Sequence, residues 1–265
     1  MNKQKSPSLL GGSMIIAGTA IGAGMLANPT AMSGIWFTGS VLLFLFIWGV
    51  TTLSALMLLE ANLHFEKGAN FDTITTQLLG KGWNILNGIS VAFTLYILTY
   101  AYITSGGSIT ESLFQRFAPE IPINHTSAAL LFCLALALFV SISTKAVDRM
   151  STILIGGMVI AFFLSTTGLL TSAKSHIFLN EVAQGETSYL PYLLSAIPTC
   201  LVSFGYHICV PTLVNYYNKN GKKVMYAVLI GSLLALLIYI SWQTAVQGNL
   251  PRAEFAPIIA KGGDV

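Results

Sequence analysis

The stretch LLGGSMIIAGTAIGAGMLANP, residues 9–29, is long enough to cross a membrane as a helix and contains no charged residue. A membrane-spanning helix needs about 20 predominantly apolar residues. Glycine, however, weakens a helix interior by about 1 kcal/mol relative to alanine, and Pro29 has no N–H for the carbonyl four residues earlier. Backbone leaves the helix at membrane depth only where it lines a cavity or is buried in protein. The stretch therefore predicts a span that breaks near Gly22–Met25.

A second stretch, YLLSAIPTCLVSFGYHICVP at residues 192–211, has the same character. A polar, glycine-containing centre again precedes a proline, Pro211, and predicts a break at Ser203–His207. Interrupted helices in corresponding positions are the best sequence pointer to a transporter site built from inverted repeats.

The charge distribution sets the class of the protein. Only 9% of the residues are charged, against about 25% in soluble domains, and none lies between Lys5 and Glu60. The net charge of +3 is too small to suggest a nucleic-acid partner. We therefore predict an all-α polytopic transmembrane helical bundle in a lipid bilayer. The charge-free intervals predict spans at 9–32, 35–62, 84–115, 127–144, 150–173, 189–218 and 223–248.

The basic residues set the orientation. A cytoplasmic N-terminus puts all but four of the 13 basic residues inside, as the positive-inside rule favours. The four outside would be Arg116, Lys174, Arg252 and Lys261. The cytoplasmic segment near 71–80 has apolar residues on one helical face, which is typical of a helix lying in the membrane interface.

The two broken spans are the first and the sixth, so five spans separate one from the next. A repeat of five helices inserts its second copy upside down, which predicts a five-plus-five inverted-repeat fold. Residues 1–173 would form the first repeat, 174–188 an external loop, and 189–265 an incomplete second repeat. We therefore expect the N-terminal part of a longer protein. The alternatives are a complete seven-helix protein and, for span one, a packing face at Gly18 and Gly22.

The breaks predict where an amino acid would bind. A helix that restarts after a break points free N–H groups at the cavity, which suit a carboxylate, and unwound carbonyls suit an ammonium group. Tyr96 and Tyr100 lie on one stripe of span three and would face the ligand, or simply pack. The candidate residues at the breaks are Thr19, Gly22, Ala23, Gly24, Met25, Ser203, Phe204, Gly205 and Tyr206.

Ionisable groups at membrane depth are candidates for proton coupling. His207 lies deepest and titrates near physiological pH, although a neutral ring bonded to a freed carbonyl explains it equally well. Glu60, at the cytoplasmic end of span two, is the other candidate, or is simply hydrated. The three cysteines lie inside predicted spans, so we expect no disulfide and no metal site, and nothing indicates a cofactor.

Residues 21–37, IGAGMLANPTAMSGIWF, resemble the signature of the bacterial aromatic amino-acid permeases. Other stretches are similar to the tryptophan-specific branch, namely residues 58–63, 71–75, 78–84, 95–103, 143–147 and 203–207. The resemblance implies an importer of tryptophan in the inner membrane, driven by protons, with eleven helices, and not an enzyme. Members of the family are considerably longer. The alternatives are a tyrosine or broad aromatic permease, sodium coupling, or a seven-helix amino-acid sensor that transports nothing.

Overall fold

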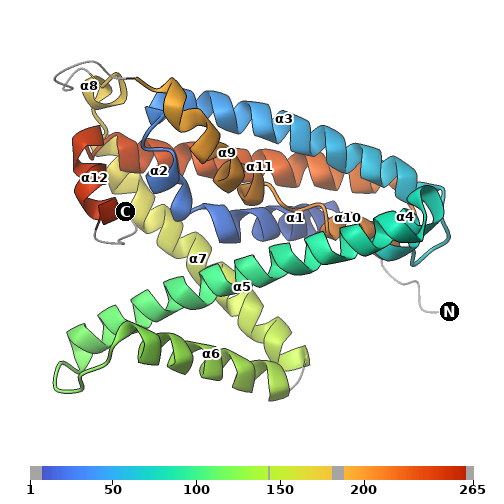
Figure 1. Cartoon of the computed structure of the whole chain (residues 1–265), viewed down its shortest axis with the longest axis horizontal. Helices are drawn as coiled ribbons and strands as arrows, with labels where there is room; N and C mark the ends of the chain where they lie inside the picture. Colours follow the sequence, from blue (N-terminus) through green and yellow to red (C-terminus); the bar gives the residue numbers. More distant parts are fainter. Residues whose placement is uncertain (1–7, 143, 181–187, 261–265) are drawn as a thin grey trace. The chain divides into compact units, whose positions relative to one another are not determined.

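The computed structural model describes residues 8–142, 144–180 and 188–260, and each regular element in these ranges is a helix (Figure 1). The predicted all-α membrane fold is confirmed. The helices are α1 (Leu9–Gly24), α2 (Ala27–Ala31), α3 (Trp36–Leu63), α4 (Phe71–Leu79), α5 (Lys81–Phe117), α6 (His125–Ile142), α7 (Thr144–Ser172), α8 (Ser175–Phe178), the 3-10 helix η1 (Leu190–Tyr192), α9 (Leu193–Ser203), α10 (Cys209–Tyr216), α11 (Gly221–Gln247) and α12 (Arg252–Ala260).

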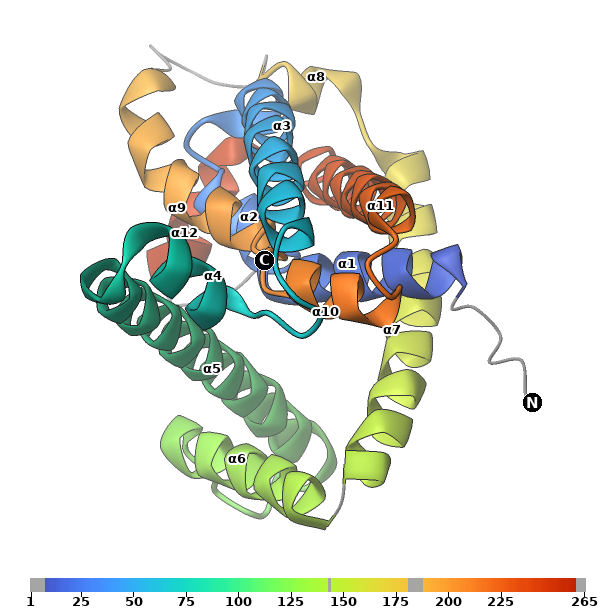
Figure 2. The same ribbon diagram turned by 90° about the vertical axis from the view of Figure 1, so that its right-hand side faces the viewer.

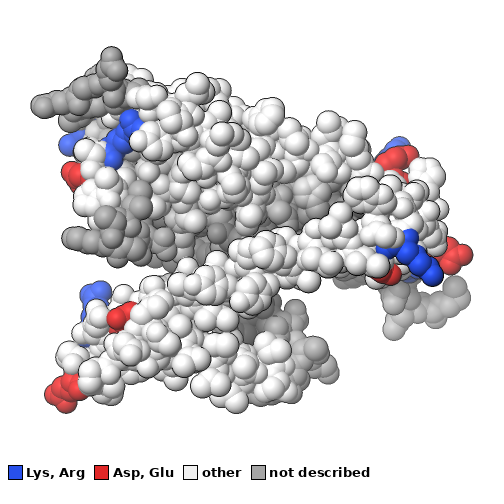
Figure 3. All heavy atoms as spheres, in the orientation of Figure 1, with Lys and Arg blue, Asp and Glu red and all other residues white. Residues whose placement is uncertain are grey.

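Each predicted span corresponds to one helix, except that the first comprises α1 and α2 and the sixth comprises η1, α9 and α10. By length and composition, α3, α5 and α11 suffice to cross a membrane, and the described parts of α1, α6, α7 and α9 form shorter apolar helices. On the face shown in Figure 3, charged side chains lie near helix ends and leave the stretches between them uncharged. Helix α4 coincides with the helix predicted near 71–80, whereas α8 and α12 were not predicted.

The chain divides into two compact units, which we describe separately. The first unit comprises residues up to 78 together with those from 162 onward, and the second comprises residues 79–161. In the second unit α5 packs against α6, and a Cβ on Gly107 would lie 2.7 Å from the Ala129 Cβ. The first unit contains helices from both proposed repeats, and the repeat boundaries stay a prediction.

The core of the first unit is made by α1, α3, α9, α10 and α11. Helix α1 packs along α11, while α3 lies beside α11 and contacts α9 and α10 (Figures 1 and 2). The crossing of α1 and α11 depends on Gly231, where a Cβ atom would lie only 2.6 Å from the Ile16 Cβ. Close packing at this point holds the first broken span against the seventh span.

Helix α12 packs onto the end of the first unit where α3 begins. Phe255 is buried and meets the Trp36 ring edge-on, with ring centroids 5.6 Å apart. The Arg252 guanidinium donates to the carbonyls of Ser33 and Gly34, at 3.2 and 2.6 Å, and lies over the Tyr189 ring. The segment after the seventh predicted span is thus a helix held by aromatic and charged contacts.

Candidate functional site at the two helix breaks

The first break is a short turn of two residues, and it lies at the end of the predicted interval. Helix α1 continues to Gly24, and the turn at Met25 and Leu26 precedes α2, which leaves in a new direction (Figure 1). Both turn residues keep right-handed helical dihedral angles, with φ −58° and ψ −51° at Met25. Because Pro29 has no N–H, the Met25 carbonyl has no helical donor four residues later. The span therefore bends after Gly24 instead of unwinding at Gly22.

The second break is wider and confirms the predicted position. Helix α9 ends at Ser203 and α10 begins at Cys209, so five residues leave the helix. Phe204 takes φ −104° and ψ 27°, outside the helical region. The Gly205 N–H turns back to the Val202 carbonyl at 3.0 Å, which closes the end of α9.

The two breaks lie against each other in the first unit. A Cβ on Gly24 would lie 2.9 Å from the Ser203 Cα and closer still to its side chain, a separation that real Cβ atoms do not reach. The Ser203 hydroxyl also lies 2.9 Å from Asn28 Oδ1. Glycine at position 24 is therefore required for close approach of the broken spans, which is a packing role.

Tyr239 on α11 connects both breaks through its hydroxyl. This group donates to the carbonyl of Ala20 and lies 2.9 Å from the carbonyl of Ser203. The Tyr239 side chain is buried, and its ring packs against those of Phe44 and Phe204. Since a hydroxyl carries one proton, the two carbonyls compete for it.

The two aromatic residues predicted to contact the substrate from the second break lie in the core of the first unit. Phe204 and Tyr206 both have an exposed fraction of 0%. The Tyr206 hydroxyl pairs with Thr52 Oγ1 at 2.9 Å, and His207 stacks on the Tyr206 ring and hydrogen-bonds to the backbone of Thr51. These contacts fasten the sixth-span break to α3.

A smaller set of predicted site residues is open at the surface of this unit. Thr19, Gly22 and Gly205 are exposed, and Met25 and His207 are half-buried. The Thr19 hydroxyl donates to the Ile15 carbonyl at 2.8 Å and lies 3.3 Å from the Cys209 sulfur. The accessible part of both breaks therefore offers a hydroxyl and glycine backbone beside the exposed apolar side chains of Leu26 and Ile208. The side chain of Ala23 lies outside the described residues.

The remaining predicted residues lie elsewhere. Tyr96 and Tyr100 belong to α5 in the second unit and are 70% and 65% exposed, so their place at the site stays a prediction. Glu60 is exposed near the end of α3, about 12 Å along the helix from Thr52. There it lines a separate pocket between α3 and α11.

Polar groups inside apolar spans are the signal that the sequence interpretation missed. Gln243 and Gln247, four residues apart on α11, are fully buried, and the Oε1 atom of each has no partner among the described residues. Asn28 Nδ2 is likewise buried and has no hydrogen-bond partner among the described residues. A buried amide is costly unless it is hydrogen-bonded, so these amides, like Tyr239, were candidates for the site.

The family model described as "Tryptophan/tyrosine permease family" matches residues 5–265. The chain belongs to the tryptophan/tyrosine permease family. The resemblance of residues 21–37 to aromatic amino-acid permeases is thereby confirmed. No solved structure matches this member of the family.

Several curated relatives of this permease-family chain carry the names of transport proteins. A tryptophan-specific transport protein of Haemophilus influenzae is 63% identical, over 100% of this chain and 64% of the relative. One of Pseudomonas aeruginosa is 52% identical, over 98% of this chain and 62% of the relative. A tyrosine permease of Enterobacter agglomerans is 39% identical, over 99% of this chain and 64% of the relative. The chain thus spans less than two thirds of the length of these relatives.

Proposed function

We propose that a permease containing this chain imports tryptophan across the bacterial inner membrane together with protons, with its N-terminus in the cytoplasm. The higher identity to two tryptophan-specific transport proteins, 63% and 52%, than to a tyrosine permease, 39%, supports tryptophan as the substrate. Transport moves the amino acid without covalent chemistry, so the proposed protein is a transporter and not an enzyme.

The observation that carries this proposal is the contact between the two helix breaks. Gly24 and Ser203 touch, and Tyr239 hydrogen-bonds to carbonyls on both sides. An amino acid bound between the breaks would have backbone groups of the turn after Gly24 and of residues 204–208 within reach, carbonyls for its ammonium group and N–H groups for its carboxylate. Exposed glycine lets a ligand approach the backbone closely.

His207 is the best candidate for proton coupling. It lies in the second break, half-buried, and its ring is held by Tyr206 and the Thr51 backbone. A proton taken up there would change the charge of the segment that contacts the substrate. Glu60 is a second candidate, placed at the end of α3 that would face the cytoplasm.

Uptake of radiolabelled tryptophan tests the proposal. Cells lacking their own tryptophan uptake would express a permease of full family length that carries these 265 residues. We expect accumulation that a protonophore abolishes and that replacement of sodium leaves unchanged. Binding without accumulation would indicate a sensor. Uptake that depends on sodium would indicate a different coupling ion. Stronger competition by tyrosine than by unlabelled tryptophan would indicate a tyrosine permease.

A further inference from the structure

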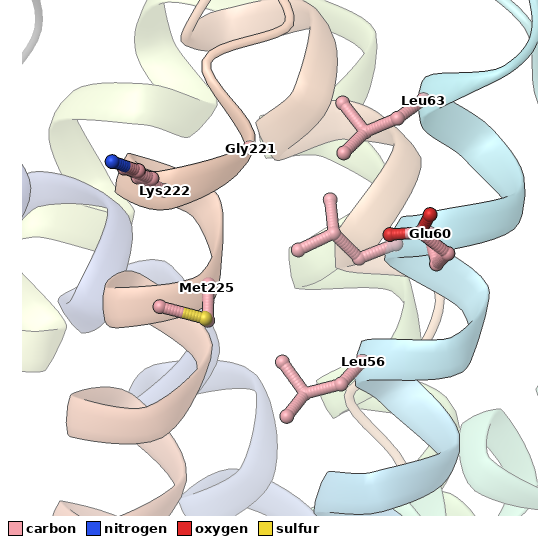
Figure 4. A pocket seen from close by; sticks show the side chains of 7 residues that line it. Leu56, Glu60, Leu63, Gly221, Lys222 and Met225 are labelled. Carbon is pink, nitrogen blue, oxygen red and sulfur yellow. The ribbon is translucent and has the colours of Figure 1, made fainter.

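A pocket of about 470 Å³ opens between α3 and α11, at one end of both helices. Its walls are apolar and include Leu56, Leu59 and Leu63 of α3 and Met225 of α11 (Figure 4). Glu60 and Lys222 stand on opposite sides of it, with the Lys222 ammonium turned outward. An apolar groove thus ends between an acid and a base on facing helices.

The exposed face of α3 ends at Glu60. Large apolar side chains that are each at least 45% exposed follow one another at helical spacing. They are Leu42, Phe46, Val50, Leu53 and Met57. From Leu42 to Glu60 the helix rises about 27 Å, close to the thickness of about 30 Å of a hydrocarbon core. Glu60 therefore falls at the level of lipid headgroups.

Helix α11 has a matching face that ends at Lys222. Tyr226, Ile230, Leu233 and Leu237 are 44–54% exposed and are spaced to lie on one stripe with Lys222. From Leu237 to Lys222 the rise is about 23 Å. Two exposed apolar stripes therefore end at the same pocket with charges of opposite sign.

We propose that this pocket binds a phospholipid whose headgroup carries a primary ammonium group, such as phosphatidylethanolamine. One acyl chain lies in the groove formed by Leu56, Leu59 and Met225, the phosphate pairs with Lys222, and the ammonium group pairs with Glu60. Pockets with basic residues between membrane helices commonly bind lipid headgroups. Glu60 favours a lipid with an ammonium group over an anionic lipid without one, because the anionic lipid would place its phosphate beside the Glu60 carboxylate with no cation between them.

Lipid retention on the 265-residue chain tests this site independently of transport. The chain would be placed in nanodiscs with equal amounts of phosphatidylethanolamine and phosphatidylglycerol of matched acyl chains. After mild detergent extraction, native mass spectrometry would count the lipids that remain bound. We expect phosphatidylethanolamine to be retained over phosphatidylglycerol.

Two charge variants separate the contributions of the headgroup contacts. Glu60→Gln should abolish the preference between the two lipids, and Lys222→Gln should lower retention of both by about fivefold. Lys81→Gln, which changes an exposed lysine outside the pocket, serves as the matched control and should behave as the unaltered chain does. Equal retention of the two lipids by the unaltered chain would overturn the proposal.

A filling variant tests the acyl-chain groove. Leu56→Trp should reduce total retained lipid, whereas Leu53→Trp, on the same exposed face but outside the pocket, should not. Unfolding temperatures of both variants within a few degrees of the unaltered chain would show that the helices still pack. Displacement of the bound lipid by added tryptophan, or equal retention by both variants, would contradict a lipid site.

Discussion

The Tyr239 hydroxyl contacts the backbone of the first and the sixth span. It lies within hydrogen-bond distance of the main-chain carbonyls of Ala20 and Ser203, and these two contacts do not depend on the side chains at those positions. Because one proton serves two carbonyls, a substrate ammonium group that bound either carbonyl would release the phenol to the other. We infer that Tyr239 senses occupancy of the breaks.

Replacing Tyr239 by Phe keeps the ring contacts but leaves two buried carbonyls without this donor. We expect the free energy of unfolding of the chain to fall by about 1–3 kcal/mol, and tryptophan uptake by the full-length permease to fall with it. Tyr226→Phe, on the exposed face of the same helix, is the control. Equal stability and equal uptake of the two variants would show that the phenol bridge has no role.

Gly24 is tested by the smallest possible change, Gly24→Ala. The new methyl group would lie 2.9 Å from the Ser203 Cα, and overpacking of this kind costs about 1–3 kcal/mol. We expect loss of stability and loss of uptake, with partial recovery in Gly24→Ala/Ser203→Gly, because most of the clash is with the Ser203 side chain. Both effects can be followed by thermal unfolding and tryptophan uptake.

Gly18 provides the matched control, since among the described residues no atom outside its own stretch of helix lies within 4 Å of a Cβ built there. Alanine is the better helix former by about 1 kcal/mol, so Gly18→Ala should leave stability unchanged or raise it. Destabilisation by Gly18→Ala as large as by Gly24→Ala would mean that helix packing in general, and not contact between the breaks, requires glycine.

At the scale of the elements, the two breaks were predicted with different success. The break at 204–208 could be located because Gly205 and the polar residues around it disfavour a helix and because Pro211 follows them. The first break was placed too early, because glycines at 22 and 24 weaken a helix without ending it, and α9 packs closely enough against α1 to keep it formed. Helix α12 was missed since its contacts with Trp36 are distant in sequence.

The burial of Phe204 and Tyr206 could not be predicted either. In a helix or strand, periodicity tells which side chains share a face, but a segment without regular dihedral angles has no such period. Their direction is decided by Thr52, Phe44 and Tyr239, which come from other spans. The sequence therefore locates the helix breaks while leaving open which of the surrounding side chains would reach a ligand.

His207 belongs to this irregular segment, and its variant His207→Gln tests proton coupling. Glutamine retains a hydrogen-bonding group for the Thr51 backbone but cannot take up a proton. We expect uptake by the unaltered permease to fall as the pH rises through the range, about pH 5–8, in which histidine titrates, and this component to disappear in the variant. An unchanged profile of initial uptake rate against pH would remove His207 from the proton path.

At the scale of the whole molecule, the packing of the first unit supports the proposed inverted repeat. Helix α1 of the first span packs on α11 of the seventh, and α9 and α10 of the sixth pack on α3 of the second. In an inverted repeat the first span corresponds to the sixth and the second span to the seventh. The contact between the first and seventh spans then corresponds to the contact between the sixth and second spans. The contacts of α1 with α9 and of α3 with α11 each join two corresponding spans, so the same symmetry relates each of these contacts to itself. A pseudo-twofold arrangement of this kind puts the two breaks at its centre.

Alkylation of Cys209 measures most directly whether tryptophan binds between the breaks. This half-buried thiol begins α10 and lies 3.3 Å from the Thr19 hydroxyl across the site. Cys133, Cys200 and every cysteine in the rest of the full-length permease would first be replaced by Ala, so that a membrane-permeant maleimide reports on this thiol. We predict that saturating tryptophan slows the alkylation rate severalfold and that lysine does not. An alkylation rate unchanged by saturating tryptophan would contradict a substrate site at the two breaks.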